Sequence, residues 1–255
     1  MELRIGFDGG RMDRNGEAEA IWSDFAGRLE VPFRCDRVRG VAYAVETNEI
    51  AYSMLVIPGH PDYRGQEYPH IVLGRRFPDD REQRTLTLLH ESVHLATFMG
   101  ALRPAYEAKA QLSGEYDFAI ERAQVAFRLA DQIFEAAAEL FVTEKFPAYA
   151  VARARYLAGM QQQACDDRLW EGLSEDTRAY GMVGYLARVD LALFLLPDED
   201  PLTAELSRWR SQLQDRLHGE RFRSLREAVS PARDFNTVSE WGPGAYREVV
   251  KRILG

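Results

Sequence analysis

Five consecutive residues, His90-Glu91-Ser92-Val93-His94, constrain the local structure of this chain more than any other stretch. On an α-helix each residue advances about 100°, so positions four apart return to within about 40° of each other. His90, Glu91 and His94 would then lie on one helical face. Two imidazoles one turn apart can bind one metal ion, and the glutamate beside them can take a proton from a water that the metal activates. The motif therefore predicts a zinc site with its own general base.

The flanking sequence predicts that the motif lies on a helix. Asp79 or Asp80 can cap the N-terminus, Glu82 suits the first turn, and Gly100 suits the end. Apolar residues recur at helical spacing and would pack one face against a core; they are Leu86, Leu89, Val93 and Ala96. The alternative is an ordinary amphipathic helix with two partly buried histidines. A chance pair would rarely carry glutamate at the one position that the metal site requires.

The motif and its flanks resemble the zincin metallopeptidases. Residues 69–99 look like the core of that fold, with a short strand, a turn and the motif helix. Residues 84–91 are similar to the lead-in of the ImmA/IrrE-type intracellular peptidases. The resemblance covers roughly a third of the chain, and within it the five-residue motif is the specific part. It implies a peptidase with one zinc ion per chain.

A catalytic zinc site needs a third protein ligand and one open position. Metzincins take that ligand from a histidine beyond the motif, but the corresponding glycine and histidine positions here hold Thr97 and Gly100. His60 and His70 precede the motif, and His218 lies far downstream. The gluzincin solution, in which a glutamate of a later helix completes the site, is therefore the expected one.

The resemblance identifies Glu135 as that third ligand. Three alanines at 136–138 follow it, then an apolar stretch and Pro147, as in the related peptidases. The small alanines would let the motif helix approach closely. Glu139, one turn further, resembles the carboxylate that fixes the tautomer and orientation of a histidine ligand in thermolysin-like enzymes. Those enzymes have aspartate at this position, and the asparagine typical of the ImmA pattern is absent here.

A solvated helix face would explain the same glutamates. At about 100° per residue, Glu135 and Glu139 fall on the side opposite Ile133, together with other polar residues. That side becomes apolar at Val142, so its C-terminal end can enter a groove. Glu135 is the preferred ligand, and Glu139 and Glu144 stay open as alternatives.

The expected fold class is α+β, with a small zincin-like N-terminal sheet and active-site helices, followed by a helical C-terminal region. Segments rich in β-branched and aromatic residues predict strands at 3–7, 31–37, 41–45, 50–57 and 70–73. Helix-forming sequence dominates after residue 80, including one long helix over about 116–146. We expect a metallopeptidase core over residues 1–150 and a helical extension packed on it over 151–255. Residues 70–73 are the expected edge strand, next to the motif helix, where an extended peptide can pair.

Composition narrows the function classes. The chain of 255 residues is 46% hydrophobic, which is enough to bury a core. It has no apolar run of membrane-spanning length, and its formal net charge of −8 disfavours non-specific nucleic-acid binding. Cys35 and Cys165 form neither a disulfide framework nor a cysteine metal site, and the N-terminus reads as a strand and not as an export signal. A cytoplasmic location is expected.

These features predict a cytoplasmic zinc-dependent hydrolase, foremost a peptidase, with a peptide or protein as its substrate. His90, His94 and Glu135 would hold the zinc, and Glu91 would be the general base. Two alternatives stay open: a regulatory or protein-interaction module with a vestigial or structural zinc site, and an amidohydrolase of small substrates. The residue that polarises the carbonyl is also open; the candidates are His70, Tyr106, Tyr116, Tyr149 and Tyr156. The sequence does not determine the oligomeric state.

Overall fold

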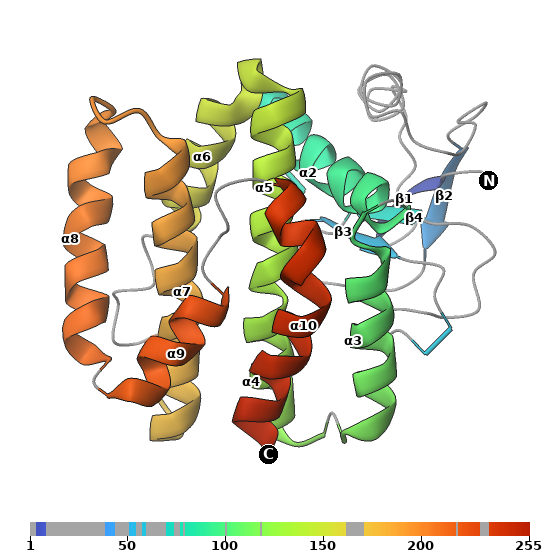
Figure 1. Ribbon diagram of the computed structural model, residues 1–255. Helices are drawn as coiled ribbons and strands as arrows, with labels where there is room; N and C mark the ends of the chain where they lie inside the picture. Colours follow the sequence, from blue (N-terminus) through green and yellow to red (C-terminus); the bar gives the residue numbers. More distant parts are fainter. Residues whose placement is uncertain are drawn as a thin grey trace. The chain divides into compact units, whose positions relative to one another are not determined.

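The computed structural model describes residues 4–8, 39–43, 51–54, 58–59, 70–73, 77–78, 80–99, 101–117, 119–161, 171–217, 219–229 and 235–255. Contacts between residues group the chain into two compact units, Met1–Ala110 and Gln111–Gly255. Figure 1 labels their helices and strands. The expected division into a core over 1–150 and an extension over 151–255 stays a prediction.

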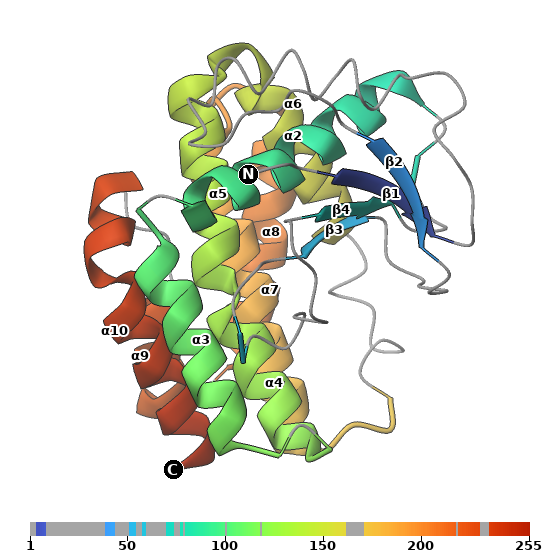
Figure 2. The ribbon, with the colours of Figure 1, turned by 90° about the vertical axis from the view of Figure 1, so that its right-hand side faces the viewer.

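Four short strands belong to the first unit: β1 (Arg4–Asp8), β2 (Arg39–Tyr43), β3 (Ala51–Met54) and β4 (His70–Leu73). They are ordered β2-β1-β4-β3, as Figure 2 shows from the side. β1 is parallel to both β2 and β4, whereas β3 is antiparallel to β4. The expected strand at 31–37 lies outside the described residues.

The expectation that β4 is the edge strand is wrong. β4 lies between β1 and β3, and β3 is the strand that contacts α2 (Arg81–Met99). The sequence of β4 explains its position, because three consecutive apolar residues suit a strand that is covered on both faces. Ile71 is fully buried.

Helices make up most of the described chain. After α2 come α3 (Arg103–Glu115), α4 (Glu121–Ala130), α5 (Gln132–Lys145), α6 (Pro147–Gln161), α7 (Glu175–Leu195), α8 (Pro201–Arg216), α9 (Glu220–Val229) and α10 (Phe235–Leu254). The expected α+β class is therefore wrong, since the described residues are mostly helical and the four short strands are a minor part. The physical reason is that long amphipathic segments bury their apolar faces against one another and need no sheet to do so.

The expected long helix over 116–146 is instead two helices, α4 and α5, which meet at Asp131. The side chain of Asp131 accepts a hydrogen bond of 2.9 Å from the hydroxyl of Tyr246 in α10. The ring of Tyr246 also contacts Phe127 and stacks on Phe134, on either side of the break. Because of the break, Glu135 lies in the first turn of a helix, where the helix dipole favours an acidic side chain.

The second unit is built around α7, which contacts α4, α5, α6, α8 and α9. Its buried core includes Met182, Leu186 and Val189. Asp190 of the same helix pairs with Arg210 of α8 and Arg226 of α9. A half-buried carboxylate with two arginine partners ties three helices together. No helix among the described residues is both long and apolar enough to cross a membrane.

Asp200 should make the stability of the second unit sensitive to acid. It caps α8, and the Leu202 amide, followed by Arg155, holds the pKa of its carboxyl below the ordinary value of 3.8. A carboxyl whose pKa is lower in the folded than in the unfolded state stabilises the fold at pH above its unfolded-state pKa. That stabilisation is lost as the pH falls through its folded-state pKa. Asp200→Ala should therefore lower the free energy of unfolding at neutral pH and lessen its decline below pH 3.8.

Urea titrations at neutral pH and near pH 3 would measure this effect. Glu199→Ala is the matched control, because its side chain is exposed and next to Asp200 in the sequence. An equal pH dependence in the Asp200 variant and the parent would contradict the expectation.

Candidate metal centre

The motif lies on α2, as the sequence predicts. Asp80 is the capping residue, because its carboxylate accepts a hydrogen bond of 2.9 Å from the backbone N–H of Gln83. Leu86, Leu89 and Val93 are buried on the helix. Their burial fixes the rotation of α2 and therefore the direction of the histidine face.

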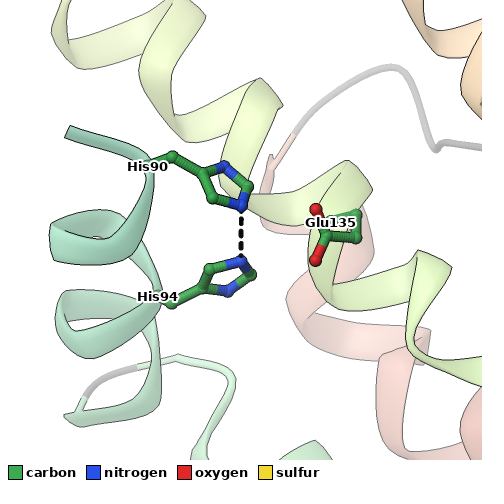
Figure 3. A group of neighbouring side chains, drawn as sticks. All are labelled: His90, His94 and Glu135. Carbon is green, nitrogen blue, oxygen red and sulfur yellow. Dashed lines mark hydrogen bonds between the residues drawn. The ribbon is translucent and has the colours of Figure 1, made fainter. Parts of the chain in front are cut away.

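The two motif histidines direct their Nε2 atoms to the same point. These atoms are 3.0 Å apart, and the rings meet nearly at right angles (Figure 3). His90 is 8% exposed, while His94 is half-buried. Two imidazole nitrogens whose lone pairs converge can bind one cation between them. Because His94 is half-buried, this point is partly open.

Zinc fits the spacing of this pair. Zinc–nitrogen bonds of about 2.0–2.1 Å at a tetrahedral angle place two imidazole nitrogens about 3.3 Å apart. The observed separation of 3.0 Å is within a few tenths of an ångström of that value. A small rotation of either ring would complete the match.

Glu135 of α5 is the candidate for a third donor. One ligand atom of each of the three residues lies within 4.8 Å of those of the other two, and Figure 3 shows their arrangement. A His-His-Glu donor set is one that catalytic zinc uses. These three residues could hold a metal ion. Their role as ligands remains a prediction.

The two alternative glutamates have other partners. Glu139 is fully buried, and its Oε1 accepts a hydrogen bond of 2.8 Å from Nε of Arg153 in α6. Glu144 is half-exposed and pairs with Lys145 at 2.8 Å. The buried ion pair gives Glu139 a role in joining α5 to α6, which sequence reasoning missed. Its proposed role in orienting a histidine ligand stays a prediction.

Glu91 has a hydrogen-bond partner that sequence reasoning missed. The hydroxyl of Ser53, in β3, lies 2.7 Å from Oε2 of Glu91 and 3.0 Å from the Glu91 carbonyl oxygen. Glu91 is 8% exposed. The serine can donate its single hydrogen to either acceptor, so it can hold the carboxylate in one orientation. No motif marks Ser53, which precedes Glu91 by 38 residues.

Tyr106 lies behind the second histidine. Its hydroxyl is 3.2 Å from Nδ1 of His94, and the side chain is 5% exposed. When Nε2 offers its lone pair to a metal, Nδ1 carries the hydrogen and can donate it to the tyrosine oxygen. Tyr106 is thus suited to orient His94.

The other candidates for a carbonyl-polarising group are three tyrosines of the second unit and His70. Tyr116 packs its ring against Phe127, and Tyr156 lies against the guanidinium of Arg153. Tyr149 is half-buried. Nothing is described of the His70 side chain, and His60, His218, Cys35 and Cys165 are outside the described residues.

Comparison with known proteins identified no relative of this chain. No protein-family model, no curated protein and no solved structure matches the chain. The resemblance to the zincins therefore rests on the motif and its flanks, and the chemistry of the site is inferred from its own residues.

Proposed function

We propose that this protein is a zinc-dependent hydrolase of the zincin type, with a peptide or protein as its substrate. The observation that carries the proposal is the grouping of His90, His94 and Glu135 around one point, with ligand atoms within 4.8 Å of one another. Glu91 follows the first of these histidines directly in the sequence, so its carboxylate would lie beside the same centre. We also propose the cytoplasm as its compartment, on the basis of the sequence alone.

His90, His94 and Glu135 would hold the zinc ion. Zinc supplies Lewis acidity, which lowers the pKa of water and polarises a carbonyl oxygen. Glu91 accepts a proton from the attacking water and returns it to the leaving amine. Ser53 positions Glu91 through the 2.7 Å hydrogen bond, and Tyr106 orients His94 through its Nδ1.

The strand β3 is suited to hold an extended peptide. It lies at the end of the strand order β2-β1-β4-β3 and contacts α2. Within the described strands its second edge has no partner, so a peptide can add to it through main-chain hydrogen bonds. Ser53 connects this strand directly to Glu91, which would bring a scissile bond near the base.

The donor set favours a catalytic over a structural zinc site. Structural sites use four protein ligands, whereas catalytic sites keep one position open. The described part of the chain groups three donors here. A purely structural site also has no need of a base beside it, and Glu91 is present. A regulatory module with a closed site is the less favoured alternative.

Metal content tests the ligand assignment. The parent, stripped of metal and reloaded with zinc, should retain close to one zinc ion per chain after dialysis. His90→Ala and His94→Ala should retain almost none, since two remaining ligands rarely hold zinc against competing buffer. Glu135→Gln should bind zinc more weakly, because a neutral amide is a poorer ligand than a carboxylate.

Glu144→Gln is the matched control, because Glu144 lies on the same helix and is half-exposed. It should retain as much zinc as the parent, and elemental analysis would measure the zinc content of each variant. Full zinc in the His94→Ala variant would overturn the site. Full zinc in Glu135→Gln together with loss in Glu139→Gln or Glu144→Gln would move the third ligand along α5.

A further inference from the structure

A cavity lies between α4 and α7 within the second unit, the helical unit Gln111–Gly255. Its volume is about 350 Å³, within the range of small-molecule sites. Its walls are formed by Val125, Arg128, Leu129, Gln132, Leu173, Thr177, Tyr180, Gly181, Gly184, Tyr185 and Arg188. None of these residues belongs to the candidate metal centre.

The charge of this cavity is opposite to that of the chain. The protein has a formal net charge of −8, yet the described residues of the lining include two arginines and no acidic residue. Arg128 is exposed, and Arg188 is half-buried. Neither has a carboxylate partner within the described part of the chain, whereas Arg153, Arg210 and Arg226 all have one. Two guanidinium groups that lack a carboxylate partner among the described residues, on one concave surface, favour an anionic ligand.

A buried amide positions the deeper arginine. Gln132 is 7% exposed, and its Oε1 accepts a hydrogen bond of 2.6 Å from Nε of Arg188. Its Nε2 donates to the Arg128 carbonyl oxygen at 3.2 Å. The amide therefore restrains the guanidinium through Nε and leaves its two Nη groups for a ligand. An arginine held in this way loses less side-chain entropy when it binds an anion.

The rest of the lining is apolar or aromatic. Leu129 is buried, Leu173 is 37% exposed, and Tyr180 is 1% exposed. Gly181 and Gly184 add no side chain to the α7 wall of the cavity. A fully hydrated inorganic anion gains little from such walls, whereas an apolar group attached to the anion can bury its surface there.

We propose that this cavity binds a small organic carboxylate, with its anionic end on Arg188 and Arg128 and its apolar body against Leu129 and Leu173. The two η-nitrogens of Arg188 can bind both carboxylate oxygens in the bidentate geometry. The site is independent of the zinc proposal, because it shares no residue with the metal centre.

Binding of 4-phenylbutyrate to the full-length protein tests the site. Saturation-transfer NMR should show saturable binding of about millimolar affinity, as expected of a ligand this small. The uncharged 4-phenylbutyramide and inorganic phosphate should each bind at least about tenfold more weakly. The first lacks the anion and the second lacks the apolar body. Equal binding of the amide, or binding of phosphate without phenylbutyrate, would overturn the proposed ligand class.

Variants locate the binding site. Arg188→Gln and Arg128→Gln should each weaken phenylbutyrate binding by at least about tenfold. Arg208→Gln on α8 is the control and should bind like the parent, because Arg208 is exposed and does not line the cavity. Arg128 is exposed, so its replacement should not affect folding, which circular dichroism would verify. Unchanged affinity in folded Arg128→Gln would overturn the proposal whatever the behaviour of Arg188→Gln.

Discussion

Glu91→Gln is expected to retain the bound zinc and lose nearly all hydrolytic activity, by at least about 10²–10⁴-fold. Glutamine keeps the shape of glutamate and can accept the hydrogen bond from Ser53, which is 2.7 Å from Oε2 in the parent. It cannot accept a proton from water. The loss would therefore arise from proton transfer and leave metal binding unchanged, which separates Glu91 from the three ligands.

Rates of cleavage of a fluorogenic peptide that the parent cleaves would measure this loss, with zinc content determined on the same samples. Ser53→Ala should reduce the rate by less than Glu91→Gln, because it removes the hydrogen bond that positions the base and leaves the base itself. Ser53→Thr keeps the hydroxyl and should recover part of the rate. If Glu91→Gln cleaves the peptide as fast as the parent, the mechanism is wrong.

Arg153→Met is expected to destabilise the helical unit by about 3–5 kcal/mol. Arg153 and Glu139 are both buried, and their 2.8 Å ion pair joins α6 to α5. Removal of the arginine leaves the Glu139 carboxylate buried without its counter-ion, and a charge in that environment is costly. The free energy of unfolding from urea titration is the relevant measurement.

The double variant Arg153→Met, Glu139→Gln should recover much of the lost stability, since it removes both charges. Arg223→Met is the surface control, because Arg223 pairs with Glu220 where both side chains are mostly exposed, and it should change stability by about 0–1 kcal/mol. A loss in Arg153→Met no larger than in this control would show that the buried pair contributes little.

Several parts of the site could be predicted from the sequence because they depend on neighbours along the chain. The common face of His90 and His94 follows from the 3.6-residue helical period, and Asp80 caps α2 by local hydrogen bonding. Burial of Leu89 and Val93 follows from the same period. The preference for Glu135 came from a resemblance, since its distance from the motif along the chain carries no geometric information.

The tertiary structure decided what depends on residues far apart in sequence. Helical propensity over 116–146 could not reveal the break at Asp131, because Tyr246, its hydrogen-bond partner, is 115 residues away. The same holds for the ion pair of Glu139 with Arg153, which gives that buried glutamate a packing role. Local pattern predicted the strands that include residues 4–7, 41–43, 51–54 and 70–73, but it could not show how small a part of the described chain they form, because it measures a preference and not which surfaces become buried together.

The sequence by itself therefore determined that His90 and His94 share one face of a helix. Only the tertiary structure decided which hydroxyls lie beside the Glu91 carboxylate and the His94 ring. The physical reason is that helical periodicity acts over a few residues, whereas the positions of Ser53 and Tyr106 depend on packing between separate elements.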